Sequence, residues 1–320
     1  MSSAATSLQV AIRAALGHAP DVIEPGRFQR FPTSDRRSDK AGWCKLFNDM
    51  RGGVFGCYRQ GISETWTAAD RATMTKEQRA ALARQVLAAT VQRQAQQRQQ
   101  WAVNADRNAQ LLAQSVLPVP GDPCALYLEQ RGLGGVWPLP AALRLHHALP
   151  YWDGGKKLGM FPVMLAPVVA HDGRMVALHR TYLTRDGRKA EVPEVKKLTG
   201  AAGPLSGTCI ALHKPVRGCI AVAEGIETAL AGWRASGLPT VAAYCAGNLA
   251  TYVWPPGINR LVVFADADPA GYAAAESLKV RALRAGLSVA VMTPSTPGAD
   301  WCDVWAQRAA VAVAASKAAA

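Results

Sequence analysis

The chain has 320 residues, 49% of them hydrophobic, and a formal net charge of +13. This length is enough for two or three domains with real cores, which excludes a disordered or fibrous protein. The basic balance favours a polyanionic partner, such as nucleic acid or nucleotides. The charge is uneven, because residues 1–217 hold 29 Lys/Arg against 16 Asp/Glu, whereas residues 218–303 hold 5 against 7.

Cysteine and histidine spacing argues against a zinc site. The seven cysteines are scattered without a CxxC pair, and the six histidines add no partner at ligand spacing. We therefore expect reduced thiols and no zinc. No apolar run reaches about 18 residues and no signal-peptide pattern is present, so we expect a cytoplasmic protein without membrane contact.

The first segment, residues 1–68, predicts a small N-terminal β-rich module. Helical periodicity covers residues 5–17, and short strand-like pieces follow at residues 26–31, 42–47 and 53–58. Aromatic residues alternate here with arginines, a composition that suits stacking on single-stranded bases. The same aromatics also suit the core of the small sheet, with the arginines on its solvated face. Both interpretations remain open.

Residues 69–117 predict a long helical connector. Proline and glycine are absent from Met74 to about Ser115, which favours one long helix or a helical hairpin. Such an element serves either as a spacer arm or as a mildly basic nucleic-acid face. The proline-rich stretch from Leu117 to Pro123 ends it.

Residues 118–216 predict a mixed α+β basic subdomain. A short helix at residues 124–133 precedes strand-like runs at 160–169, 175–183 and 208–213. Six cations gather around the second turn between these runs. They would repel one another without an anion nearby, so a phosphate-binding face is expected, with a solvated loop as the alternative. They are Arg180, Arg185, Arg188, Lys189, Lys196 and Lys197.

Residues 217–320 predict an α/β domain with a largely parallel sheet. Strands at 218–224, 240–245, 260–266 and 287–292 alternate with helices at 226–236 and 270–285, and an Ala-rich helix starts at about 303. No GxxxxGK[ST] motif occurs, which excludes a P-loop ATPase or helicase motor.

Carboxylates follow the strands of this last domain. Glu224 ends one strand, and Asp266 and Asp268 end another. Ligands of parallel sheets bind at the carboxyl ends of strands, and clustered carboxylates repel unless a cation joins them. Mg²⁺ or Mn²⁺ would relieve this repulsion, with Asp300 and Asp303 as further candidate ligands. The structural alternative is that these acids only cap helices.

These acidic stretches resemble a known family. The stretch Glu224-Gly-Ile-Glu227 and the stretch Asp266-Ala-Asp268-Pro-Ala-Gly271 are similar to the two metal-binding motifs of Toprim domains, which have a Rossmann-like fold. Upstream, the stretch Tyr127-Leu-Glu-Gln-Arg-Gly-Leu133 and the stretch Lys196-Lys-Leu-Thr-Gly200 resemble the catalytic core of DnaG-type primases. The whole arrangement resembles Toprim primases of phages, plasmids and integrated elements, without the N-terminal zinc ribbon.

The resemblance implies a DNA primase that joins NTPs into short RNA primers on single-stranded DNA, with a replicative helicase in trans. Glu224, Asp266 and Asp268 would be catalytic, with Asp300 and Asp303 as additional metal ligands. The nucleotide or DNA contacts would be Arg131, Arg180, Lys196, Lys197 and Asn248, the last in a small-residue turn at 246–249. A Toprim-type nuclease and a non-catalytic single-strand-binding accessory protein are the alternatives.

Overall fold

The computed structural model describes residues 3–35, 39–134 and 137–308. The chain forms two compact units, Met1–Gln100 and Trp101–Ala320. Among the described residues, no helix is long and apolar enough to cross a membrane. The C-terminal part of the Ala-rich helix expected from about residue 303 lies outside the described residues, which are helical from 301 to 308.

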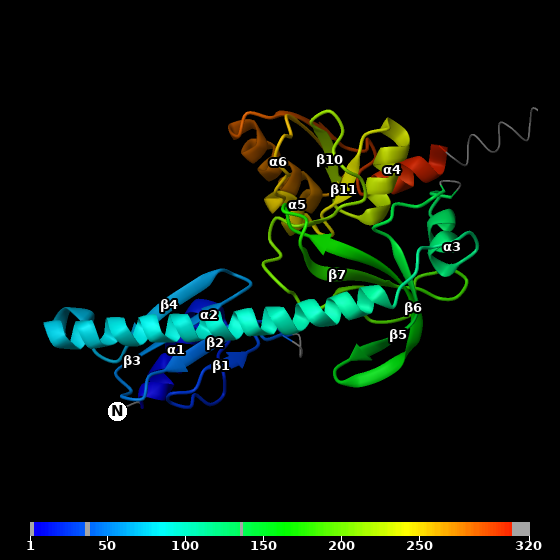
Figure 1. The fold of residues 1–320 in the computed structure, drawn as a ribbon. Helices are drawn as coiled ribbons and strands as arrows, with labels where there is room; N and C mark the ends of the chain where they lie inside the picture. Colours follow the sequence, from blue (N-terminus) through cyan, green and yellow to red (C-terminus); the bar gives the residue numbers. More distant parts are fainter. Residues whose placement is uncertain (1–2, 36–38, 135–136, 309–320) are drawn as a thin grey trace, which may run out of the picture. The chain divides into compact units, whose positions relative to one another are not determined.

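The first unit is a four-stranded antiparallel sheet between two helices (Figure 1). Its strands are β1 (Gln29–Phe31), β2 (Gly42–Leu46), β3 (Gly52–Cys57) and β4 (Ile62–Thr67), in that order. Helix α1 (Ala4–Leu16) covers one face, and the first part of α2 (Lys76–Ala113) covers the other. A short 3-10 turn, η1 (Arg71–Thr73), precedes α2. The long proline-free stretch is therefore a single helix of 38 residues.

The aromatic residues of this unit mostly fill its core. Phe31 and Phe55 pack under α1, whereas Trp43 and Phe47 pack under α2, and all four are buried. Glycines make room for these rings, because a Cβ on Gly56 would lie 2.6 Å from the Trp43 indole. The core interpretation of these four rings is thus the correct one.

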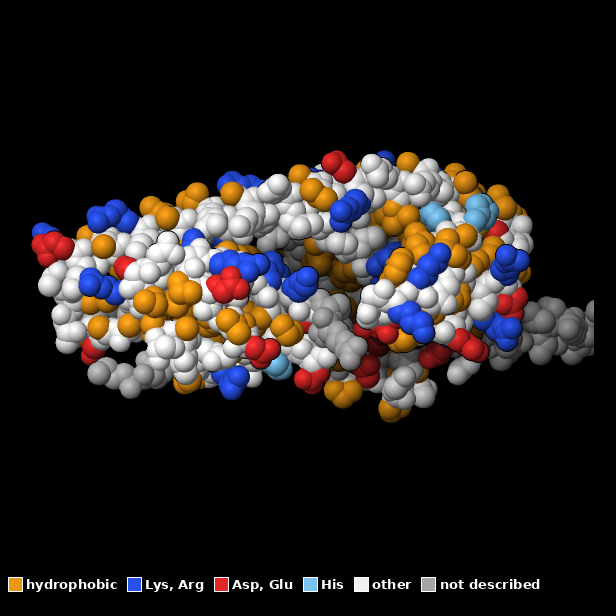
Figure 2. All heavy atoms as spheres, turned by 90° about the horizontal axis from the view of Figure 1, so that it is seen from below, with side chains coloured by type: hydrophobic (Ala, Val, Ile, Leu, Met, Phe, Trp, Pro, Cys, Tyr) orange, Lys and Arg blue, Asp and Glu red, His pale blue; other side chains and the backbone are white. Residues whose placement is uncertain are grey.

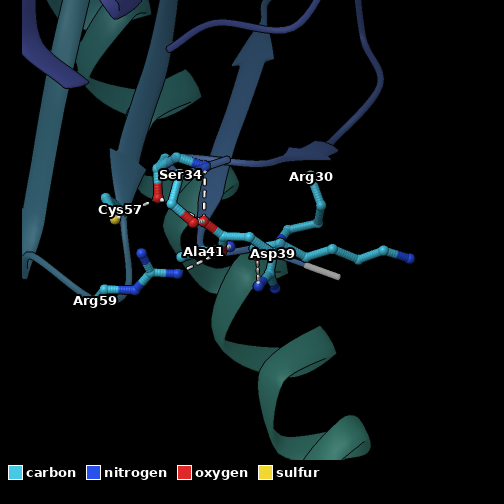
Figure 3. A network of polar contacts seen from close by, with 8 residues as sticks. Arg30, Ser34, Asp39, Ala41, Cys57 and Arg59 are labelled. Atoms are coloured by element: carbon cyan, nitrogen blue, oxygen red, sulfur yellow. Dashed lines mark hydrogen bonds and ion pairs between the residues drawn. The ribbon is translucent and has the colours of Figure 1, made fainter. Parts of the chain in front are cut away.

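One buried carboxylate ties the loop before β2 to the sheet (Figure 3). Asp39 accepts hydrogen bonds from the backbone N–H groups of Thr33 (2.9 Å) and Ala41 (2.9 Å) and from the Ser34 hydroxyl (2.7 Å). The Arg59 guanidinium lies 2.7 Å from Asp39 Oδ1, the same oxygen that accepts from Ala41. Burial would raise the pKa of Asp39, but these donors outweigh it and hold the pKa well below its ordinary value.

The second unit is built on one nine-stranded mixed sheet with the order β13-β12-β10-β11-β9-β6-β7-β8, while β5 pairs with β6. Strands β10 (Cys219–Ala223), β11 (Thr240–Ala242), β12 (Arg260–Phe264) and β13 (Ser288–Met292) are parallel. Helices α4 (Ile226–Ser236), α5 (Ala246–Thr251) and α6 (Pro269–Arg284) connect them. This is the expected α/β architecture, with α5 in place of the small-residue turn.

The other half of this sheet is antiparallel. It contains β5 (Arg144–Asp153), β6 (Lys156–Val169), β7 (Met175–Tyr182) and β8 (Lys196–Leu198), and β9 (Cys209–Ile210) joins it to the parallel half. Helix α3 (Pro123–Gln130) packs on one face of this half. Sequence patterns missed β5, whose pairing with β6 is interrupted by two irregularities, and β8, which is only three residues long.

Candidate functional site

The acids predicted from the strand ends lie at one edge of the parallel sheet. Ala223 pairs with Phe264 and Phe264 pairs with Met292, so the residues that follow β10, β12 and β13 leave the sheet at the same level. Glu224 follows β10 directly, and Asp266 and Asp268 follow β12. This is the edge at which open α/β sheets bind ligands.

Asp266 shows most clearly that the acids interact. Its Oδ1 atom is buried and has no hydrogen-bond partner among the described residues. Burial, followed by the charges of Glu224, Asp300, Asp268 and Asp303, raises the pKa of Asp266 to about 7. Burial and the charge of Asp268 also raise the pKa of Glu224. The edge therefore holds more negative charge than its own donors neutralise.

Asp268 also has a structural role. It is the N-cap of α6, where its Oδ1 accepts a hydrogen bond of 2.7 Å from the Gly271 N–H. Gly271 lies against the backbone of Asp266, because an added Cβ would sit 2.5 Å from the Asp266 carbonyl oxygen. The absence of a side chain at Gly271 thus lets the first turn of α6 lie close against the backbone of Asp266.

Asp300 and Asp303 are largely occupied by their own surroundings. Each accepts a hydrogen bond from the other's backbone N–H, at 2.8 Å and 3.3 Å. The remaining oxygens lie 3.8 and 3.7 Å from the Arg131 guanidinium. Their charges still act on Asp266, but their oxygens are less available as metal ligands than those of Glu224 and Asp266.

A divalent cation fits this edge. The unpartnered oxygen of Asp266 and the raised pKa values of Asp266 and Glu224 are what a cation would relieve. Within residues 3–35, 39–134 and 137–308, no three His, Cys, Asp or Glu side chains converge tightly enough to form a complete ligand set. Mg²⁺ does not need one, since it commonly uses one or two carboxylates together with water and substrate phosphate.

A second acid of the same motif, Glu227, has the opposite environment. It is buried in the first turn of α4, where Lys196 Nζ lies 2.9 Å from Oε1 and 3.0 Å from Oε2. The Tyr127 hydroxyl donates to the same carboxylate. Burial raises the pKa of Glu227, but Lys196 and Tyr127 outweigh it and lower the pKa to about 2. Sequence reasoning assigned no role to Glu227, because its partners lie 31 and 100 residues away.

Lys196 links the two halves of the sheet. It lies on β8, next to the Thr181 position of β7, and its side chain is ion-paired with Glu227. Its charge also opposes the rise in the pKa of Glu224, so the ammonium group acts on the acidic edge as well as on Glu227. Its side chain is still 39% exposed, which leaves this cation accessible to an incoming anion.

The other predicted cations point elsewhere. Arg180 and Lys197 form a cross-strand pair on the opposite face of the β7–β8 ribbon, because neighbouring residues of a strand alternate between faces. There, Arg180 donates to the Tyr182 hydroxyl (3.1 Å), and Lys197 lies 4.0 Å from the centre of the Tyr151 ring. The structure thus brings Lys196, and not these two, to the acids.

Asn248 is placed inside the fold. It is buried on α5, where its Oδ1 accepts from the Gly207 N–H (2.9 Å) and its amide donates to the carbonyl oxygens of Thr208 and Ala243. These bonds fix the segment that leads into β9. The side chain has its hydrogen-bonding groups directed at the backbone instead of at a ligand.

Comparisons with known proteins match two segments of the second unit. Residues 219–310 match the family model of the Toprim domain, and residues 103–209 match that of a domain of unknown function, DUF7146. The segment that carries Glu224, Asp266, Asp268, Asp300 and Asp303 is therefore a Toprim domain. None of the curated proteins matches this chain in sequence.

Several solved primase structures are similar at low identity. The DnaG primase catalytic domain bound to ssDNA has 17% identity and a TM-score of 0.46 over 66% of this chain and 77% of its own. The primase fragment of the bacteriophage T7 primase-helicase protein has 16% identity and a TM-score of 0.37 over 89% and 98%. A DNA primase domain from Pseudomonas aeruginosa has 16% identity and a TM-score of 0.34 over 49% and 51%, so the chain spans about half of that relative.

Proposed function

We propose that this protein is a DNA primase, which makes short RNA primers on single-stranded DNA by metal-dependent nucleotidyl transfer. The observation that carries the proposal is the position of Lys196. A strand outside the Toprim domain presents this cation beside the acidic edge, and the buried Glu227 holds it there. A site for transferring nucleotides needs both charges, because acids hold metal while cations bind the phosphates of NTP and template.

The carboxylates have distinct roles in this proposal. Glu224, Asp266 and Asp268 would hold Mg²⁺ or Mn²⁺, one or two of them directly and the rest through bound water, with Asp300 and Asp303 as outer acids. The bound ion would stabilise charge on the transferring phosphoryl group. Lys196 would bind an oxygen of the incoming triphosphate, and its pairing with Glu227 would orient it.

Arg131 has a supporting role in the same site. Its guanidinium lies 3.7 to 3.8 Å from Asp303 and Asp300, and its Nε is buried without a partner among the described residues. It would hold these two acids in place and reduce their repulsion of incoming phosphates. Arg180 and Lys197, on the opposite face, would contact the template strand away from the reacting groups.

Primer synthesis is the decisive assay. The protein is incubated with single-stranded DNA, labelled NTPs and Mg²⁺ or Mn²⁺, and the products are separated by length. Short labelled RNA that disappears in Asp266→Asn supports the proposal. Metal-dependent shortening of labelled DNA without NTPs would instead identify a nuclease. Binding of DNA without either reaction would identify an accessory protein.

The wider setting follows from the same proposal. We infer that the protein acts in the cytoplasm with a helicase in trans, in replication of a phage, plasmid or integrated element. Stimulation of primer synthesis by the replicative helicase of the host or element is the measurement that tests this.

A further inference from the structure

The hairpin formed by β5 and β6 exposes a group of large hydrophobic side chains. Trp152 is 55% exposed, Leu158 44% and Met160 49%. Pro150 pairs with Met160 and Trp152 pairs with Lys157, so these residues lie close together at the end of the hairpin. Three large exposed side chains at one strand end form a patch of the kind that marks a binding site.

The hairpin is held rigidly below this patch. The Tyr151 ring packs edge-on against Tyr182, with 4.8 Å between the ring centres, and its hydroxyl accepts a 3.0 Å hydrogen bond from the Glu194 N–H. Lys197 Nζ donates to the Trp152 carbonyl oxygen (3.2 Å) while it lies over the Tyr151 ring. The backbone that carries the exposed indole is therefore anchored to β7 and β8, whereas the indole itself is left in solvent.

The charges on the hairpin itself are mainly positive. Lys156 and Lys157 are both exposed, and neither forms an ion pair in the part of the chain that the structure describes. Asp153 is the single acid between Arg144 and Met160. Figure 2, which looks from the side on which this hairpin ends in Figure 1, shows cationic and hydrophobic side chains next to one another on this face of the second unit.

We propose that the end of the β5–β6 hairpin binds single-stranded nucleic acid, with a base stacked on Trp152 and the adjacent phosphates on Lys156 and Lys157. An exposed indole next to flexible cations is the combination that binds single strands without sequence preference. A duplex would hide its base faces from the indole. An apolar protein surface would cover the three hydrophobic side chains but would leave the two lysines without an anionic partner.

This inference deepens the proposed function, because it names where the template strand lies, and it rests on that proposal only for the identity of the strand. Its test is a binding measurement that needs no catalysis. Failure of primer synthesis and failure of strand binding at the hairpin are therefore separate results.

The experiment measures binding of the full chain to a labelled oligothymidylate of about 15 nucleotides by fluorescence anisotropy at several salt concentrations. Trp152→Leu keeps an apolar side chain but removes the stacking face, and we expect about tenfold weaker binding. Trp152→Phe keeps an aromatic face and should stay within about threefold of the wild type. Thermal unfolding of each variant checks that it is folded.

The lysines are tested by salt dependence. Each phosphate contact to a single strand contributes about 0.7 to the slope of log affinity against log salt. We expect the double variant Lys156→Gln/Lys157→Gln to lower this slope by about 1.4. Arg284→Gln is the matched control, because Arg284 is an exposed cation at the end of α6, and it should leave the slope unchanged.

A contact map completes the test. An oligonucleotide that carries iododeoxyuridine is irradiated with the protein, and the cross-linked peptide is identified by mass spectrometry. A cross-link to Trp152 supports the proposal. The proposal would be overturned if Trp152→Leu bound with wild-type affinity, if the lysine double variant kept the wild-type slope, or if cross-links were confined to other segments.

Discussion

Two aspartates, one in each unit, show how differently the same residue type is used. Asp39 in the first unit is buried and receives donors on both oxygens, so its pKa is held well below its ordinary value. Asp266 in the second unit has a buried oxygen without a donor, and neighbouring acids help to raise its pKa to about 7. The first arrangement stabilises a fold, whereas the second stores repulsion that a bound cation would remove.

The largest expected effect is on activity. Asp266→Asn keeps the size of the side chain but removes a charged metal ligand, and we expect primer synthesis to fall by about 10³-fold or more. Product formation is measured at saturating NTP over a range of Mn²⁺. Asp39→Asn is the control and should retain activity in the folded fraction. Comparable synthesis by wild type and Asp266→Asn would show that this aspartate is not part of the reacting site.

The next largest effect is expected on stability, after substitution of Asp39. Asp39→Asn places an amide N–H₂ among donors that need an acceptor, and it removes the partner of Arg59. We expect a loss of about 2 to 3 kcal/mol in the free energy of unfolding. Urea unfolding of the full chain measures it, with the transition of the first unit affected. A variant as stable as the wild type would mean that the Asp39 network is not structural.

Because folding lowers the pKa of Glu227, we expect this residue to make the free energy of unfolding depend on pH in the acidic range. Its pKa falls from 4.5 to about 2 on folding, so its contribution to stability is complete well above pH 4.5 and is lost as the pH falls toward 2. Between pH 6 and pH 3 this corresponds to about 2 kcal/mol. We expect Glu227→Gln to be less stable than the wild type at pH 6. Between pH 6 and pH 3, the free energy of unfolding of the variant should fall by about 2 kcal/mol less than that of the wild type. Parallel pH profiles of the two proteins would contradict the ion pair with Lys196.

The smallest expected effect is on the stability of Asp266→Asn, and it tests directly whether Asp266 differs from Asp39. In the absence of divalent metal, Asp266→Asn removes a charge that Glu224 and Asp268 repel, so the variant should be more stable than the wild type by about 1 kcal/mol. Thermal unfolding in the presence of a chelator measures it. Added Mg²⁺ should raise the melting temperature of the wild type more than that of the variant. Destabilisation by Asp266→Asn in the chelator would place Asp266 in the same structural class as Asp39.

The sequence predicted the parallel half of the second unit well, because its strands are continuous apolar runs, and acids follow two of them, β10 and β12. Helix α4, for example, begins and ends at the predicted residues. The antiparallel half of the sheet was harder to predict from the sequence. Its strand β8 is held by pairing with β7 and by the contact of Lys196 with Glu227, neither of which leaves a local pattern. Strand β5 combines a proline with irregular pairing, which hides its alternation.

The candidate site divides in the same way. Glu224, Asp266 and Asp268 follow strand ends, so a sequence places them at one edge once the sheet is recognised. The cations do not follow this rule, because a one-residue step along β8 sends Lys196 and Lys197 to opposite faces. The buried Asn248 illustrates a further limit, since only the fold shows that its amide is bonded to the backbone near Gly207.

The most direct test of this account is a Mn²⁺ titration followed by electron paramagnetic resonance, which separates free from bound ion. We predict that wild-type protein binds Mn²⁺ at a site that Asp266→Asn and Glu224→Gln each weaken by at least about tenfold, whereas Asp39→Asn leaves it intact. Equal Mn²⁺ binding by the wild type and by both edge variants would contradict the claim that these carboxylates form a metal site.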